Sequence, residues 1–169
     1  KGKKGPLKTS TGIPTSVCFG FLNSLFTIIN DYQPQFFAVA FDLKEATFRH
    51  SADKDYKADR QETPLDFIED ITNLQRLLTG LNISIVTAVG YEADDVIGTL
   101  ANQGANHHCQ VKILSGDRDL FQLVDNQRQI SVLYLQKNIG KYELFNEEEV
   151  INKMGVKPSQ IVDYKALCG

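Results

Sequence analysis

Residues 83–119 read ISIVTAVGYEADDVIGTLANQGANHHCQVKILSGDRD, and this stretch decides the fold class. Two short runs rich in β-branched residues, at 83–87 and 111–114, have the length and composition of buried strands. Residues 93–103 between them are typical of a helix, so the stretch predicts a strand, a helix and a second strand. Strands that alternate with helices are typical of a parallel sheet flanked by helices. This stretch therefore predicts an α/β fold.

The sequence on either side continues the alternation of helices and strands. Upstream, we expect a helix from Pro14 to Asp31, a buried strand at Phe36–Phe41 (FFAVAF) and a helix that begins with a Thr63 cap. The elements expected downstream are a short helix at 120–124, strands at 130–135 and 142–145, a helix at 147–154 and a last helix after Pro158. The whole chain, 1–169, is predicted to form a single domain with a mostly parallel sheet flanked by helices.

Composition limits the kinds of partner that the chain can have. It has 169 residues, with 18 Lys and Arg against 21 Asp and Glu, so its net charge of −3 excludes binding of nucleic acid through bulk charge. The cysteines Cys18, Cys109 and Cys168 are far apart, which argues against disulfides or a zinc site and favours a reducing cytoplasm. No apolar run is long enough to cross a bilayer, so we expect a cytoplasmic protein with no membrane partner.

Acidic residues follow three of the expected strands. The carboxyl ends of parallel strands form one edge of a sheet, where ligands bind, so these side chains are expected to converge. The acidic residues that share this placement are Asp42, then Glu92, Asp94 and Asp95 of GYEADD, and Asp117 and Asp119 of SGDRD. A structural interpretation of each also exists, because Asp is common in turns and helix caps and complements helix dipoles.

The number of these acids favours a metal site. Two carboxylates about 5 Å apart repel each other by roughly 3 kcal/mol at an effective dielectric near 20. Divalent ions with oxygen ligands remove that repulsion, and two such ions about 4 Å apart suit phosphodiester hydrolysis. A phosphatase or another phosphoryl-transfer enzyme is the alternative that the acids alone would allow, but it would not account for the basic segment described next.

The connection over residues 43–62 is long, charged and without clean periodicity, and such loops are usually functional or disordered. If it is helical, four of its side chains fall within an arc of about 100°, which suits a phosphate backbone and an unpaired base. These side chains are Arg49, Tyr56, Lys57 and Arg60. A solvated charged loop is the other interpretation, because acids balance the bases of this segment.

Six segments together resemble the 5′-nuclease domains of the flap-endonuclease family. They are TSTGIPTSVCFGFLNSL (9–25), VAFDLKEATFRHSADKDYKADR (39–60), TPLDFIEDI (63–71), VGYEADDVIGTLA (89–101), ILSGDRDLFQLV (113–124) and VDYKALCG (162–169). The resemblance implies a PIN-like (resolvase-like) fold and a structure-specific 5′-3′ exonuclease or flap endonuclease of DNA and primer RNA in replication and repair.

The resemblance also implies a role for each site residue. Two Mg²⁺ ions are expected, for which Mn²⁺ can substitute. The first would be held by Asp42, Glu92, Asp94 and Asp95, and the second by Asp117 and Asp119. Residues 43–62 would form an arch over the single-stranded 5′ end, with Arg49, Tyr56, Lys57 and Arg60 on DNA and Lys57 also catalytic.

The chain differs from the family pattern at both ends. The family begins with a strand that ends in a metal-binding Asp and continues, beyond the equivalent of Gly169, into an Asp-rich segment and a helix–hairpin–helix. We therefore expect this piece alone to be weakly active or inactive. The expected setting is a monomer on bacterial nucleoid DNA with a polymerase domain downstream, acting on 5′ ends, flaps and RNA primer–DNA hybrids. The alternative is a DNA-binding or scaffolding module without catalysis.

Overall fold

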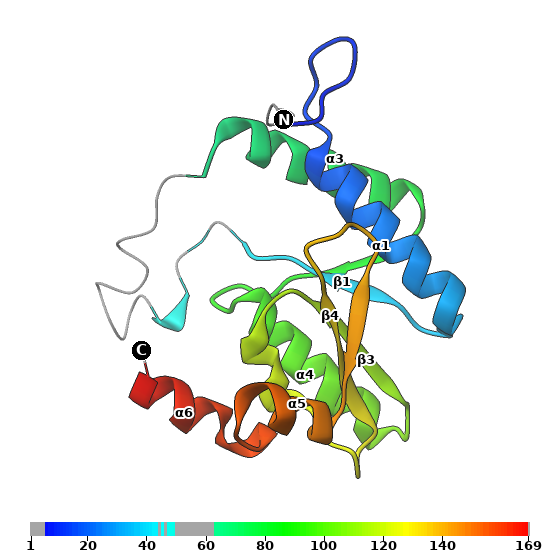
Figure 1. Ribbon diagram of the computed structural model, residues 1–169. Coiled ribbons are helices and arrows are strands. Elements are labelled where there is room, and N and C mark those ends of the chain that lie inside the picture. The colour runs from blue at the N-terminus through cyan, green and yellow to red at the C-terminus, as the bar shows by residue number, and fades with distance from the viewer. Residues whose placement is uncertain (1–5, 44, 46, 50–62, 169) are drawn as a thin grey trace. The chain divides into compact units, whose positions relative to one another are not determined.

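The computed structural model describes residues 6–43, 45, 47–49 and 63–168. The chain divides into two compact units, Lys1–Glu92 and Ala93–Gly169, which are described separately below. Both units combine helices with parallel strands, which confirms the predicted α/β class (Figure 1).

The described part of the first unit combines helices with a pair of parallel strands. Its elements are α1 (Ser16–Tyr32), β1 (Ala38–Ala40), α3 (Leu65–Gly80) and β2 (Ser84–Val86). β1 pairs in parallel with β2, with Ala40 opposite Val86 at the carboxyl end. The strand expected over Phe36–Phe41 is therefore shorter than its apolar run, although the Phe41 N–H still donates to the Val86 carbonyl at 3.2 Å.

The apolar stripe of α1 packs against α3, as the spacing of its side chains predicts. Leu25 of α1 and Leu74 and Leu78 of α3 are almost fully buried, and Val39 of β1 joins the same cluster. Removal of this much apolar surface from water is the main source of stability for a unit of this size.

A buried carboxylate links the two helices of the first unit. Thr15, at the N-cap of α1, makes no side-chain cap bond. Asp70 of α3 accepts instead from the Val17 N–H (2.6 Å) and the Cys18 N–H (3.1 Å), and only 1% of its surface is exposed. Burial opposes ionisation of Asp70, but the donors around it outweigh burial and lower its pKa. The same burial, with the Asp70 charge nearby, raises the pKa of the Cys18 thiol to about 12.

The predicted cap of α3 is wrong. The N-cap residue is Pro64 rather than Thr63, and no side chain caps the helix, because proline has neither a side-chain oxygen nor a free N–H. Asp66, the acid three residues after Thr63, pairs with Lys8 at 2.5 Å instead of taking part in a cap.

The second unit contains a three-stranded sheet and short helices. Its elements are α4 (Ala93–Asn106), β3 (Val111–Ser115), η1 (Arg118–Leu123), β4 (Ile130–Leu135), β5 (Tyr142–Phe145), α5 (Glu147–Met154), η2 (Pro158–Gln160) and α6 (Ile161–Cys168). The strand order is β3-β4-β5, with β3 and β4 parallel and β5 antiparallel to β4. The short helix expected at 120–124 is a 3₁₀ helix that begins earlier, at Arg118.

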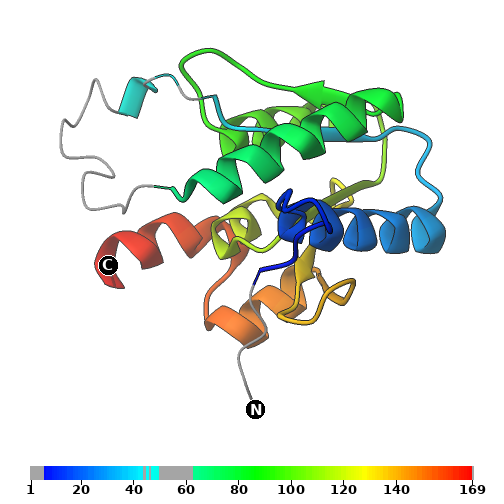
Figure 2. The ribbon, with the colours of Figure 1, turned by 90° about the horizontal axis from the view of Figure 1, so that it is seen from above.

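An aromatic cluster forms the centre of the second unit. Phe121 of η1 is fully buried and stacks on Phe145 of β5, with ring centroids 4.5 Å apart, and Tyr134 of β4 completes the cluster. α6 lies along η1 on the side away from the sheet (Figure 2). No helix in the described ranges is both long and apolar enough to cross a membrane.

The Asp70 carboxylate gives a test of how the first unit is held together. We expect Asp70→Asn to lower the free energy of unfolding by about 1–3 kcal/mol near pH 7, because two N–H donors lose a charged acceptor in a buried place. Since the folded pKa is lowered, this contribution is complete above about pH 4 and is lost as pH falls further. Urea unfolding at a series of pH values measures both effects.

Asp66→Asn is the matched control on the same helix. Its ion pair with Lys8 is exposed, so the loss should stay below about 1 kcal/mol. Equal losses for the two variants would contradict the special role of Asp70.

Candidate metal centre

Asp42 and Glu92 follow the carboxyl ends of the two paired strands in the first unit. Because Ala40 lies opposite Val86, the residues that follow both strands start at the carboxyl end of the pair. Asp42 is exposed and comes two residues after β1, whereas Glu92 follows β2 by six residues and is only 14% exposed at its side chain. The two strands thus end at one edge of the pair, and Asp42 and Glu92 follow those ends along the chain.

The start of the charged connection packs on the loop that carries Glu92. The Phe48 N–H donates to the Gly90 carbonyl at 3.0 Å, and the Phe48 and Tyr91 rings lie 5.6 Å apart. Arg49 then places its Nη1 3.8 Å from Glu92 Oε2. Arg49, which the sequence predicts on DNA, thus lies beside an acid predicted to hold metal. The other predicted DNA contacts, Tyr56, Lys57 and Arg60, lie outside the described residues.

Asp94 and Asp95 begin α4 in the second unit. Both lie in its first turn, where a negative charge complements the helix dipole. Their placement therefore also fits a purely structural interpretation, in which the acids stabilise the start of the helix. Asp94 shares a helix face with Gly98, four residues later. A side-chain carbon at Gly98 would lie 3.6 Å from Leu123 Cδ2, so this face of α4 is the one toward η1.

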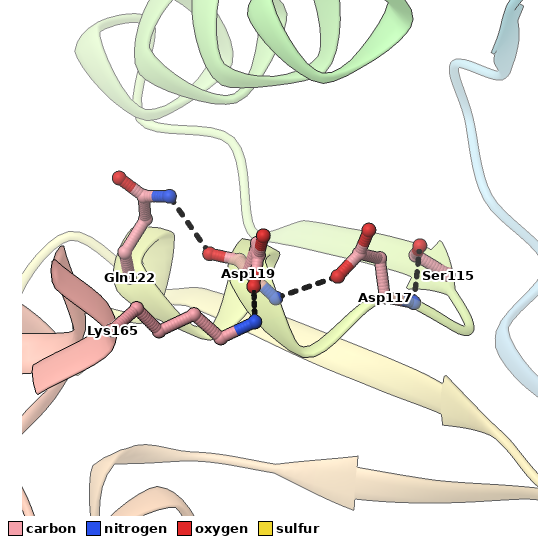
Figure 3. A network of polar contacts seen from close by, with 5 residues as sticks. All are labelled: Ser115, Asp117, Asp119, Gln122 and Lys165. Carbon is pink, nitrogen blue, oxygen red and sulfur yellow. Dashed lines mark hydrogen bonds and ion pairs between the residues drawn. The ribbon is translucent and has the colours of Figure 1, made fainter. Parts of the chain in front are cut away.

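Asp117 and Asp119 are joined directly in the turn after β3 (Figure 3). Ser115 Oγ accepts from the Asp117 N–H at 3.0 Å, and Asp117 Oδ1 accepts from the Asp119 N–H at 2.8 Å. Asp117 is therefore the N-cap of η1, as the structural interpretation of this pair predicts. Capping uses one oxygen of Asp117 and neither carboxylate oxygen of Asp119.

The core fixes where these two acids lie. Leu120 and Phe121, the next residues along the chain, are 2% and 0% exposed, and they hold η1 against the sheet. Since β3 ends at Ser115, Asp117 lies in the short turn after the strand and Asp119 in the first turn of η1. Packing of the two apolar residues of DRDLF in the core thus fixes the positions of its two aspartates.

Lys165 of α6 forms an ion pair with Asp119 Oδ1. That oxygen is enclosed by protein, yet among the described residues it accepts no regular hydrogen bond, and its contact is with the lysine ammonium. The sequence motifs did not predict Lys165 at this site. Lys165 lies in the VDYKALCG segment, which belongs to the family resemblance. A lysine in a short helix, however, gives no sequence pattern that identifies its ion-pair partner.

The acids of the second unit have the donor chemistry for a divalent cation. Within either unit, the described residues hold no group of three or more His, Cys, Asp or Glu side chains placed to share one ion. Mg²⁺ usually takes only one or two protein carboxylates, with water and substrate phosphate as its other ligands. The Asp117–Asp119 pair meets that requirement, and the enclosed Asp119 Oδ1 already contacts a positive charge.

Comparison with known proteins identifies similar sequences over almost the whole chain. Residues 2–155 match the family described as 5′-3′ exonuclease, N-terminal resolvase-like domain. The chain is 58% identical, over 171 aligned residues, to DNA polymerase I of Synechocystis sp.; the match includes 99% of this chain and 17% of that protein. It is 37% identical over 159 residues to a 5′-3′ exonuclease of Bacillus subtilis, covering 94% of this chain and 53% of that protein. The chain thus spans less than two thirds of either relative.

A solved structure shares the fold. It is the bacteriophage T5 D15 flap endonuclease in a pseudo-enzyme–product complex with DNA and metal ions, with a TM-score of 0.68 at 16% identity. The match includes 90% of this chain and 58% of that one. At this identity the likeness shows the fold, and the expected resolvase-like architecture is confirmed.

Because Asp117 caps η1 and Asp119 forms an ion pair, substitutions of these two residues should lower the free energy of unfolding by different amounts. We expect Asp117→Ala to lower the free energy of unfolding by about 0.5–2 kcal/mol, because η1 loses its cap. Asp119→Asn removes only a partly exposed ion pair and should cost below about 1 kcal/mol. Chemical unfolding in EDTA measures both, and a larger loss for Asp119→Asn would contradict the assignment of the cap to Asp117.

Proposed function

Because this chain belongs to the family of 5′-3′ exonuclease N-terminal resolvase-like domains, we propose that it is the nuclease part of a longer polypeptide. Its reaction would be the hydrolysis of phosphodiester bonds at the 5′ ends and flaps of DNA, and in primer RNA paired with DNA. The observation that supports this most is the Asp117–Asp119 pair, held by the core at the end of a parallel strand.

We propose that two groups of carboxylates hold two divalent ions, Mg²⁺ in the cell, with Mn²⁺ as a substitute. Asp42, Glu92, Asp94 and Asp95 would hold the first, and Asp117 and Asp119 the second. When bound, such ions make water a stronger nucleophile and stabilise charge on the phosphate that is cleaved. The chain's own part is to orient the oxygens: the Asp117 cap and the buried Leu120 and Phe121 keep this turn from moving.

The basic residues of the charged connection would bind the single-stranded 5′ end. We propose that Arg49, Tyr56, Lys57 and Arg60 contact phosphates and an unpaired base, and that Lys57 also assists the reaction. The packing of Phe48 and Arg49 on the 90–92 loop supports this, because it brings the start of the connection to an acid of the proposed metal site. Cations on phosphate supply affinity that a chain of net charge −3 otherwise lacks.

The longer relatives suggest the setting of this activity. Since the chain spans 17% of the Synechocystis DNA polymerase I, we propose that a polymerase domain follows it in the same polypeptide. Such a protein would act in the bacterial cytoplasm on replicating or damaged DNA, where primer removal and synthesis are coupled.

Flap cleavage tests the proposed reaction. The polypeptide that carries this chain should cleave 5′-flap DNA in the presence of Mg²⁺, leaving a 5′-phosphate, and EDTA should abolish the cleavage. Asp117→Asn should lower the rate by about 10–100-fold, as expected when the support of a metal site is lost. Binding of flap DNA without any Mg²⁺-dependent cleavage would contradict the proposal and favour a DNA-binding module.

Lys57 tests the proposed DNA contact separately from the metal site. We expect Lys57→Ala to lower flap cleavage by about tenfold or more in the intact polypeptide, because a charge that contacts phosphate is lost. Mg²⁺ affinity, measured by isothermal titration calorimetry, should change by less than twofold. A parallel loss of Mg²⁺ affinity would show that Lys57 acts through the metal site instead.

A further inference from the structure

The Lys165–Asp119 ion pair has a consequence for metal binding. We propose that Lys165 is a tethered counter-ion that occupies the cation position of Asp119 until a divalent ion displaces it. This inference rests on the proposed function, because it takes the Asp117–Asp119 pair as the place where the ion binds. It makes α6 a competitor for that ion rather than a passive neighbour.

The position of the ammonium supports this assignment. The Lys165 side chain reaches from α6 to η1 and meets Asp119 Oδ1, the enclosed oxygen that accepts no regular hydrogen bond from the described residues (Figure 3). An enclosed anionic oxygen needs a positive partner, and either an ammonium or a metal ion can satisfy it. The two cannot occupy that one position together, since like charges at contact distance repel.

Other polar groups around this turn are engaged elsewhere. The Gln122 amide donates to the backbone carbonyl of Asp119 at 2.8 Å, and the Arg118 guanidinium lies over the Tyr134 ring, 5.9 Å from its centroid. Ser115 Oγ accepts from the Asp117 N–H. Lys165 is therefore the cation that the described contacts place on the Asp119 carboxylate.

The lysine can leave without unfolding the unit. The Lys165 and Asp119 side chains are 42% and 46% exposed, so the lysine side chain borders solvent and its ammonium can move into water, although Asp119 Oδ1 itself is enclosed. Lysine carries a strongly hydrated ammonium on a flexible four-carbon stem. Displacement would replace the singly charged ammonium beside Asp119 with a doubly charged metal ion, while the capped turn stays in place.

Manganese titration of the whole chain, followed by electron paramagnetic resonance, tests the competition. We expect Lys165→Met to lower the Kd for Mn²⁺ by about three- to tenfold, because the ion no longer displaces a charge from a partly exposed pair. Lys165→Arg retains the charge and should stay within about twofold of the wild type. Lys153→Met, which removes the same charge from an exposed position on α5, is the matched control and should also stay within about twofold.

The outcomes separate this inference from the proposed function. An unchanged or raised Kd in Lys165→Met, with normal Mn²⁺ binding in the wild type, would overturn the competition alone. Equal Mn²⁺ binding by the wild type and Asp119→Asn would overturn the metal site and the inference together. Thermal unfolding adds a reading that does not depend on activity: Mn²⁺ should raise the Tm of Lys165→Met more than that of the wild type, because tighter binding stabilises the folded state more.

Discussion

The parallel register of β3 on β4 is the constraint on which the acidic turn of the second unit depends. It ends β3 at Ser115, so that the chain must turn at once into η1. Leu120 and Phe121 then enter the core, with Asp117 at the N-cap and Asp119 in the first turn of η1, where the Asp117 side chain accepts from the Asp119 N–H. The position of the two carboxylates thus follows from strand pairing and aromatic packing.

Charge balance is the second theme of the structure. In each unit a basic side chain lies on one of the predicted metal-site acids, Arg49 on Glu92 in the first unit and Lys165 on Asp119 in the second. Neighbouring carboxylates are costly without cations, and these side chains reduce that cost within each unit. If these acids hold metal as proposed, each basic side chain would have to move when an ion binds, and Arg49 is also proposed to contact DNA.

The sequence predicted local features well and distant partners poorly. Periodicity and strand-forming runs located the helices and the parallel strands, and the acids after β1 and β3 were expected at carboxyl edges, where each unit places them. The cap of α1 by Asp70 could not be predicted, because its partner lies more than 50 residues away and leaves no local pattern. The contact of Lys165 with Asp119 could not be predicted for the same reason. The predicted Thr63 cap was wrong because Pro64 is the N-cap residue. Asp117 and Asp119 were the most predictable part of the candidate site, since their spacing and the Asp117 cap are both local.

Anomalous diffraction from crystals of the Mn²⁺-loaded polypeptide tests the central claim most directly. The account predicts one manganese peak about 2.0–2.3 Å from carboxylate oxygens of Asp117 or Asp119, and a second beside Asp42 and the Glu92–Asp95 group. Lys165 should then have left Asp119. Peaks that contact none of these carboxylates, or saturating Mn²⁺ that gives no peak at either place, would contradict it.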